Sequence, residues 1–183
     1  MGDFKYQDII DFWFDEKHKS LWFNSTPLFD AELKEIFELV YNAACNDELN
    51  DWKTEAEGLL ALVIIFDQFP LNMYRGDAKS FATEERSRQI ARHAIDSGMD
   101  QKLSQEQKSF LYMPFMHSEN LEEQDQAIAL FESAGLTGNV TFAHHHRDII
   151  SRFGRFPHRN AILNRENTEA EKNYMVSGEA FLG

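Results

Sequence analysis

Apolar residues recur every three to four positions along most of the chain, which is the spacing of one face of an α-helix. One such run lies within residues 4–15, and a second extends from Phe29 to Ala44 with acidic residues on its other side. A third run, residues 58–69, is apolar in every direction and stops at Pro70. Because a segment without a polar face has to be surrounded by protein, we expect this run to be the central helix.

Short capping patterns mark where other helices begin. Ser/Thr-x-x-Glu/Gln patterns, in which the first and fourth residues cap each other's backbone amides, start at Thr54, Ser104 and Thr168. Further helices are expected at residues 80–98, 105–113, 119–134 and 140–153, each ending at or beside a glycine or a proline. No segment has the convincing alternation of a strand, so the pattern predicts an all-α protein.

The same pattern predicts how the helices pack. No shift in composition divides the chain, so we expect residues 1–183 to form a single domain of stacked antiparallel helices. Residues 90–98 and 127–135 place small side chains on one helical face, which lets neighbouring helices approach closely, as in helical-repeat proteins. The regular tetratricopeptide repeat is absent, so the expectation is of tetratricopeptide-like packing only.

Composition and charge exclude several classes of protein. Cys45 is the only cysteine, so an internal disulfide is impossible and a reducing compartment is expected. The longest apolar stretch, residues 59–66, is too short to span a bilayer, and the first residues do not form a secretory signal. We therefore expect a cytoplasmic protein without a membrane partner. The net charge of −13 argues against a nucleic-acid partner, because phosphates repel it.

One segment has the opposite charge. Between His144 and Arg165 lie five arginines and a single acid, Asp148. The arginines are Arg147, Arg152, Arg155, Arg159 and Arg165. This asymmetry predicts a basic region on an otherwise acidic protein.

The loop at residues 152–160 is a candidate anion site. Gly154 ends a predicted helix, Pro157 stiffens the following turn, and Phe153 and Phe156 are of the type that anchors a loop in a core. A loop held in this way would direct its polar side chains toward an anion. These side chains belong to Arg152, Arg155, His158, Arg159 and Asn160. The alternative is a solvated basic loop, which explains the charge but not the two aromatic residues.

Asp67 and Gln68 lie at the predicted end of the central helix, where the helix dipole disfavours a carboxylate. A buried carboxylate at that position needs a compensating cation, and Arg75 is the nearest candidate. A structural ion pair and a site residue both fit this pattern. We expect Asp67 to stabilise the fold and Arg155 to bind ligand.

His117 precedes a predicted helix for which Ser118 is the expected N-cap residue. A histidine there is either structural or part of an anion site, because helix N-termini attract anions. His117 with Glu119, or His146, is a candidate general acid or base. Consecutive histidines on a helix, such as His144 to His146, point about 100° apart, so they do not suit a metal ion. Neither a metal nor a cofactor is expected.

Four motifs recur together in one known family. They are Asp67-Gln68-Phe69-Pro70 with Arg75-Gly76, Tyr112-Met113-Pro114 with His117-Ser118-Glu119, His146-Arg147, and the run from Phe153 to Asn160. In these motifs the chain resembles the bacterial domain-of-unknown-function family numbered 924. Leu71 departs from the family, which usually has an arginine there. The resemblance implies a tetratricopeptide-like helical fold and brings no established activity.

Two functions fit these observations. In the first, the polar segments converge in one pocket that binds a small carboxylate or phosphate ligand. The residues of this pocket would be Asp67, Gln68, Arg75, Arg147, Arg152, Arg155, His158, Arg159 and Asn160, with His117, Glu119 and His146 as candidates for acid–base chemistry. In the second, the chain is a helical interaction module whose basic groove clamps an acidic peptide or a C-terminal carboxylate. Neither function names a reaction, so the sequence does not decide whether the chain is an enzyme.

Overall fold

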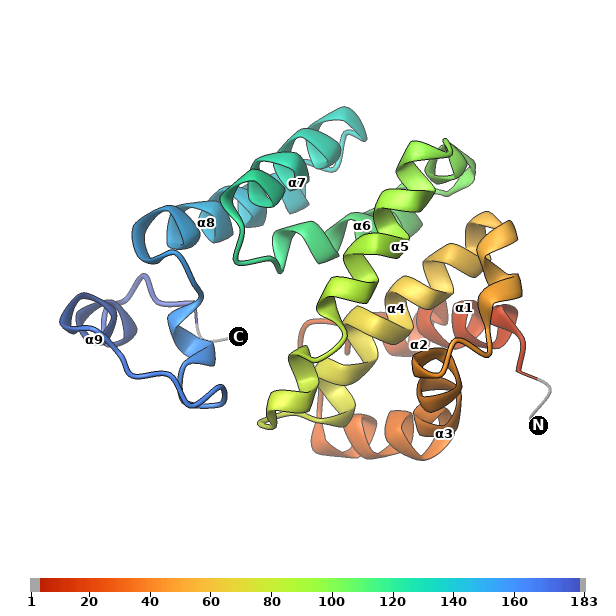
Figure 1. The fold of residues 1–183 in the computed structure, drawn as a ribbon, viewed down its shortest axis with the longest axis horizontal. Helices are drawn as coiled ribbons and strands as arrows, with labels where there is room; N and C mark the ends of the chain where they lie inside the picture. Colours follow the sequence, from red (N-terminus) through yellow and green to blue (C-terminus); the bar gives the residue numbers. More distant parts are fainter. Residues whose placement is uncertain (1–3, 182–183) are drawn as a thin grey trace. The chain divides into compact units, whose positions relative to one another are not determined.

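Helices account for all regular secondary structure in the computed structural model, which describes residues 4–181 (Figure 1). The α-helices are α1 (Tyr6–Phe14), α2 (Glu16–Lys19), α3 (Pro27–Cys45), α4 (Ala56–Met73), α5 (Glu84–Asp96), α6 (Gln105–Met116), α7 (Leu121–Ser133), α8 (Thr137–Phe153) and α9 (Glu169–Met175). Short 3-10 turns are η1 (Asn50–Thr54), η2 (Ala78–Phe81), η3 (Met99–Lys102) and η4 (Pro157–Arg159). The predicted all-α class is confirmed.

Contacts divide the chain into two compact units, with the boundary inside α6. The first unit holds α1 to α5 and α6 as far as Pro114. The second unit holds the end of α6 together with α7, α8 and α9, and residues 76–78 group with it. The single domain and the tetratricopeptide-like packing stay predictions.

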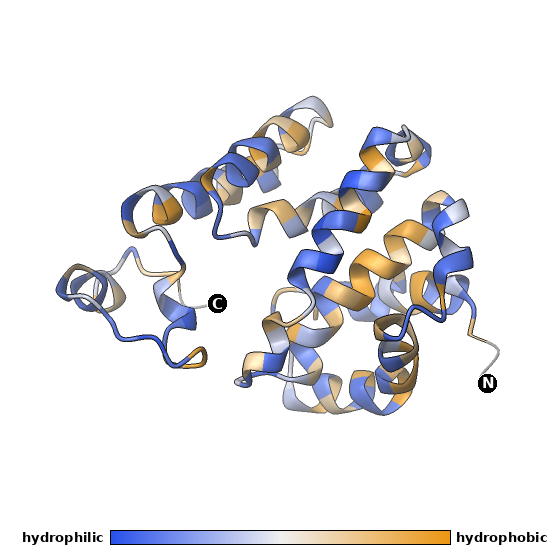
Figure 2. Cartoon of the chain, viewed as in Figure 1, coloured by the Kyte–Doolittle hydropathy of each residue, from blue (hydrophilic) through white to orange (hydrophobic). Residues whose placement is uncertain are grey.

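α4 is the centre of the first unit. It contacts α1, α3 and α5, and every residue from Gly58 to Pro70 is buried. In Figure 2 the helix is coloured as hydrophobic along most of its length. It has the length and composition of a membrane-spanning helix, but 89% of it is buried inside the protein, which accounts for its apolar surface. The predicted central helix is therefore confirmed.

The predicted end of this helix at Pro70 is wrong, because α4 continues to Met73. Proline has no backbone N–H, so the carbonyl of Phe66, four residues earlier, lacks its usual helical donor. The hydroxyl of Thr83 donates to that carbonyl at 2.7 Å. The hydrogen bond that Pro70 removes within α4 is thus replaced by one from the segment that precedes α5. As a consequence, Asp67 lies inside the helix and not at its end.

The start of α4 also differs from the prediction. Thr54 is not a helix cap, since it belongs to η1 and its hydroxyl donates to the carbonyl of Asp51 at 2.8 Å. The N-cap residue of α4 is Glu55, and its side chain makes no capping hydrogen bond. Gly58 allows η1 to pack directly on α4, because a Cβ atom there would lie 2.1 Å from the carbonyl oxygen of Trp52.

α7 and α8 pack against each other in the second unit (Figure 1). α8 ends at Phe153 as expected, and Gly154 follows with a left-handed conformation (φ 69°). A small hydrophobic core lies behind this turn, and its buried members are Ile149, Ile150, Phe156 and Tyr174. The capping box at Thr168 is confirmed at the start of α9, as is the one at Ser104 at the start of α6.

Further helix boundaries differ from the prediction. The helix expected at residues 80–98 is divided into η2 and α5, and α6 continues through Pro114 to Met116. α7 begins after Asn120, whose side chain accepts hydrogen bonds from the first amides of the helix. Ser118 is not the cap, because its hydroxyl accepts from the Asn120 amide and bonds to the carboxylate of Glu123.

Candidate functional site

The predicted site residues are divided between the two units. Asp67, Gln68 and Arg75 belong to the first unit. Those that belong to the second unit are His117, Glu119, His146, Arg147, Arg152, Arg155, His158, Arg159 and Asn160. The convergence of the two sets in one pocket stays a prediction.

In the first unit, Asp67 is buried, and its carboxylate accepts a hydrogen bond from the Gln68 side chain at 2.6 Å. Arg75 does not compensate it as expected. The Arg75 guanidinium instead donates to Asp30 at 2.7 Å and to the side-chain oxygen of Asn72 at 3.0 Å. This correction follows from the helix boundary, because α4 continues past Asp67 and carries the chain away before Arg75 is reached.

In the second unit, Glu119 holds the loop that follows α8. The backbone amide of Phe156 donates to its carboxylate at 2.8 Å, and both terminal nitrogens of Arg165 donate to it at 2.7 and 2.9 Å. Burial acts to raise the pKa of Glu119, but Arg165, the Phe156 amide and the charge of Arg159 keep it below its usual value. A carboxylate that is ionised and bound in this way has a structural role and is poorly placed to donate a proton.

Arg155 also has a structural partner. Its guanidinium donates to both carboxylate oxygens of Glu171, at 2.6 and 2.9 Å, and to the carbonyl of Glu166 at 2.8 Å. Glu171 is almost fully buried, and the hydrogen bonds from Arg155 lower its pKa to about 2. The fork of Arg155 is thus engaged with α9 in this structure, and its binding of a ligand stays a prediction.

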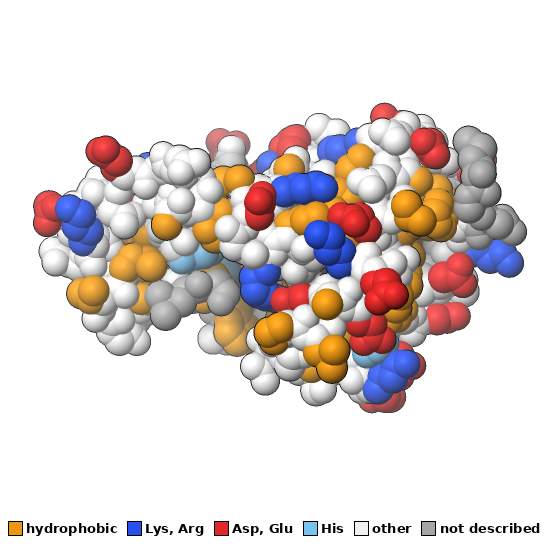
Figure 3. Space-filling model, turned by 90° about the horizontal axis from the view of Figure 1, so that it is seen from below, with side chains coloured by type: hydrophobic (Ala, Val, Ile, Leu, Met, Phe, Trp, Pro, Cys, Tyr) orange, Lys and Arg blue, Asp and Glu red, His pale blue; other side chains and the backbone are white. Residues whose placement is uncertain are grey.

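Arginines on α8 are paired with acids of the second unit. Arg147 pairs with Asp125 of α7 at 2.7 Å, and Arg152 lies 3.5 Å from Asp148 and 4.0 Å from Glu179. On the face drawn in Figure 3, basic side chains lie among acidic ones. The local charge of the sequence does not produce a continuous basic surface there.

The segment that carries His117 is fixed by side chains from two other elements. Gln124 of α7 is fully buried, and its amide donates to the carbonyls of Met116 at 2.6 Å and Ser118 at 2.7 Å. Arg159 donates to the intervening carbonyl of His117 at 3.0 Å. Sequence reasoning missed Gln124, because a single glutamine in an amphipathic helix carries no signal of its own.

His117, His146, His158 and Arg159 form one group, which we call the histidine cluster. The ring of Phe156 is its base, with ring centroids 5.5 Å from His146 and 5.6 Å from His158. The Arg159 guanidinium lies over the same ring at 4.6 Å and is almost fully buried. The structure therefore brings together residues of three segments: His117 before α7, His146 of α8, and the adjacent His158 and Arg159 of η4.

Both buried rings of the cluster are neutral at pH 7. Burial, assisted by the nearby charges of His117 and Arg159, lowers the pKa of His146 to about 4. Burial and the charge of Arg159 lower the pKa of His158 to about 3. The Nδ1 atom of His146 lies 2.9 Å from the Phe142 carbonyl, which can only accept, so this nitrogen carries the proton and Nε2 is an acceptor.

Two further features of the cluster were not predicted. The Nδ1 atom of His158 is buried and has no hydrogen-bond partner within residues 4–181. The ring of Phe181 covers the cluster, with its centroid 4.6 Å from that of His146 and 5.1 Å from that of His158. The Phe181 amide is held by the Tyr174 hydroxyl at 2.9 Å. Since Phe181 lies beyond the last predicted helix, the periodic pattern does not indicate its position.

The histidines of α8 behave as helical geometry requires. His144 is exposed, His145 is half-buried and His146 is buried, so the three rings point in different directions. Within the part of the chain that the structure describes, no three histidine, cysteine or acidic side chains are grouped closely enough to hold a metal ion.

Comparison with known proteins places the chain among relatives. The model of a bacterial family of proteins of unknown function, DUF924, matches residues 9–179. A solved structure of a protein of unknown function from Agrobacterium tumefaciens is similar, with a TM-score of 0.89 and 41% sequence identity over 94% of this chain and 97% of that one. No protein with a curated function matches the sequence. The resemblance drawn from the four motifs is confirmed.

Proposed function

This chain belongs to the bacterial family of unknown function DUF924, and we propose that it binds a small anion, a carboxylate or a phosphate, at the histidine cluster. The observation that carries this proposal is the unpartnered Nδ1 atom of His158, buried near the guanidinium of Arg159. Leaving a buried polar atom without a partner costs about 1–3 kcal/mol, and a hydrogen bond from a ligand offsets this cost.

Arg159 supplies the positive charge, because His146 and His158 are neutral. Its guanidinium is oriented before any ligand arrives, by the Phe156 ring beneath it and by the His117 carbonyl. The planar fork of a guanidinium matches the oxygens of a carboxylate or phosphate. His158, when its proton is on the unpartnered Nδ1 atom, adds a hydrogen bond to such a ligand without the cost of burying a further cation.

Proton uptake is the expected signature of binding at this site. An anion near His146 and His158 favours their charged forms and raises both pKa values toward the usual range. Binding and protonation are then linked, so affinity for the anion increases as the pH falls from about 7.5 to about 5.5. Binding of an anion whose own charge is constant in this range, such as sulfate, at a site made of arginine alone would not show this dependence.

The alternative of an acidic-peptide clamp receives less support. A clamp of that kind needs arginine forks that face outward, and the forks of the basic segment are engaged with carboxylates of the same unit. The arginines concerned are Arg147, Arg152, Arg155 and Arg165. Arg159 donates to the His117 carbonyl, lies over an aromatic ring and is close to two neutral histidines.

The test uses inorganic phosphate and succinate as probes, with binding measured by calorimetry at several pH values. We expect Arg159→Lys to weaken binding at least about tenfold, since the variant keeps the charge but loses the fork. The matched control is Arg147→Lys, which changes the same residue type on α8 at a position paired with Asp125. That control should bind as the unmodified protein does.

The pH dependence is a second readout that does not rely on a variant. In buffers of different ionisation heat, the number of protons taken up per bound sulfate, an anion that does not titrate in this range, should be above zero at about pH 6. Equal affinity in the Arg159→Lys and Arg147→Lys variants would contradict the proposal, as would binding without proton uptake.

A further inference from the structure

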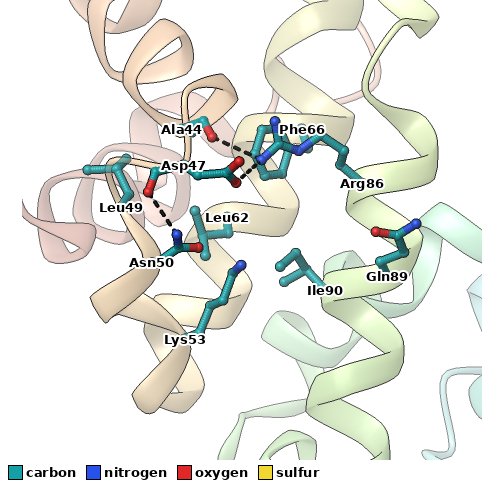
Figure 4. Close-up of a pocket in the computed structure, with 10 residues that line it drawn as sticks. All are labelled: Ala44, Asp47, Leu49, Asn50, Lys53, Leu62, Phe66, Arg86, Gln89 and Ile90. Atoms are coloured by element: carbon teal, nitrogen blue, oxygen red, sulfur yellow. Dashed lines mark hydrogen bonds and ion pairs between the residues drawn. The ribbon is translucent and has the colours of Figure 1, made fainter.

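A hollow of about 110 Å³ lies in the first unit, where the end of α3 and η1 face α4 and α5 (Figure 4). Its floor is apolar and its rim is polar. The floor includes Leu62, Phe66 and Ile90, and the rim includes Asn50, Lys53 and Gln89. None of these residues belongs to the histidine cluster or to the site predicted from the sequence.

The hollow is built by a close contact at its edge. Trp52 is buried, and its carbonyl oxygen occupies the space that a side chain at Gly58 would fill. This contact fixes η1 against α4 and places Asn50 and Lys53 at the rim. The Asn50 amide donates to the carbonyl of Asp47 at 2.8 Å, which holds that part of the rim in place.

Arg86 forms one wall of the hollow, and its charge is already matched. It donates to the carbonyls of Cys45 at 2.7 Å and Ala44 at 3.2 Å at the end of α3, and it pairs with the Asp47 carboxylate. Its guanidinium lies 4.7 Å from the centre of the Phe66 ring. Arg86 therefore closes the end of α3 and is not the group that attracts a ligand.

Lys53 is different, because its charge has no partner. The side chain is half-buried and points into the hollow between Leu62 and Ile90 in Figure 4. Within residues 4–181 no hydrogen bond or ion pair reaches its ammonium group. An ammonium beside an apolar floor is the arrangement that complements a molecule with one negative charge and a hydrocarbon part.

We propose that this hollow binds a short-chain aliphatic carboxylate. The carboxylate pairs with Lys53, and the hydrocarbon chain lies on Leu62 and Ile90. A single ammonium, with the Asp47 carboxylate on the same rim, suits one negative charge better than a doubly charged phosphate. The volume limits the ligand to a few carbon atoms.

The experiment is a titration followed by the methyl NMR signals of Leu62 and Ile90, which report on the hollow and not on the histidine cluster. The probes are butyrate, its neutral analogue butyramide, and acetate. Butyrate should shift both signals and saturate. Butyramide, which lacks the charge, and acetate, which lacks the chain, should each bind at least about tenfold more weakly.

Lys53→Met should reduce butyrate affinity at least about tenfold, while Lys102→Met, which removes an exposed lysine of the same unit, should leave it unchanged. If Lys53→Met does not fold, the comparison of butyrate with butyramide in the unmodified protein still decides the proposal. Equal shifts from butyrate and butyramide, or no shift of the Leu62 and Ile90 signals, would overturn it.

Discussion

Every residue of α4 from Gly58 to Pro70 is buried in the first unit, whereas the core behind α8 in the second unit is a small cluster that includes Phe156 and Tyr174. Figure 2 shows the same contrast, with α4 mostly hydrophobic and α7 to α9 mostly hydrophilic. The second unit adds charged pairs to its core. Two of them, Glu171 with Arg155 and Glu119 with Arg165, are partly or almost fully buried.

This difference predicts different responses to pH. The burial of apolar surface does not change with protonation, but an ion pair is lost when its carboxylate becomes protonated. Buried histidines that are neutral in the folded protein act in the same direction. They take up protons more readily in the unfolded chain, so the free energy of unfolding decreases as the pH falls. We therefore expect acid to destabilise the second unit first.

The largest effect is expected in the core of the first unit. Phe69 is fully buried, and its ring lies 4.9 Å from that of Phe37 and 5.7 Å from that of Trp13. Phe69→Ala should lower the free energy of unfolding by about 3–5 kcal/mol, because it removes a large side chain and leaves a cavity. Urea denaturation measures this loss, with the exposed Phe23→Ala as control. A loss below about 1 kcal/mol would show that the packing around α4 is loose.

The next effect concerns pH and the second unit. The pKa of His146 is about 4 in the folded chain and its usual value is 6.5, so the unfolded chain binds more protons between these values. Stability should therefore fall by roughly 3 kcal/mol from this residue as the pH falls from 6.5 to 4. His146→Asn keeps a donor for the Phe142 carbonyl but does not titrate, so its stability should depend less on pH in this range. If the free energy of unfolding had the same pH dependence in the unmodified protein and in His146→Asn, the lowered pKa of His146 would be refuted.

A somewhat smaller loss is expected at Glu171. Glu171→Gln removes the charge that pairs with Arg155 and should lower the free energy of unfolding by about 2–3 kcal/mol at pH 7. This loss is smaller than that for a fully buried pair, because Arg155 is partly exposed. The folded pKa is about 2 against a usual 4.5, so this contribution is present above pH 4.5 and is lost as the pH falls to 2. Hydrogen exchange should show weaker protection in α9 and unchanged protection in α4. Weaker protection in both helices would mean that the units unfold together.

The smallest effect is expected at the join between α4 and α5. Thr83→Val keeps the shape of the side chain but leaves the buried carbonyl of Phe66 without its donor. The free energy of unfolding should fall by about 1–2 kcal/mol, measured by thermal denaturation. Thr137→Val, at an exposed position of α8, serves as the control and should have little effect.

The helical pattern predicted most of the fold, because periodicity and capping are local properties. The central helix, the turn at Gly154 and the capping box at Thr168 all follow from residues within a few positions of one another. The helix end at Pro70 was wrong for a related reason. The group that satisfies the carbonyl freed by the proline comes from Thr83, and a local pattern cannot indicate a partner that far along the chain.

The candidate site was predicted less well, because electrostatic partners are set by the fold. Five arginines near α8 suggested an anion site, but Arg147 and Arg155 form ion pairs with carboxylates on α7 and α9. His158 was selected from the sequence, yet its neutral state depends on burial that only the structure reveals. The hollow beside Lys53 was not predicted at all, since it depends on the contact between Trp52 and Gly58.

The hydrogen bond from Thr83 to Phe66 also restricts the order in which the chain can accumulate substitutions. While Pro70 is present, loss of the threonine leaves a buried carbonyl unsatisfied. If Pro70 is first replaced by alanine, the new amide can donate to that carbonyl within the helix, and the threonine is then not needed to satisfy it. The two positions are therefore epistatic. The route from the Pro/Thr sequence to the Ala/Val sequence that replaces the threonine first passes through a less stable protein, whereas the route that replaces the proline first does not.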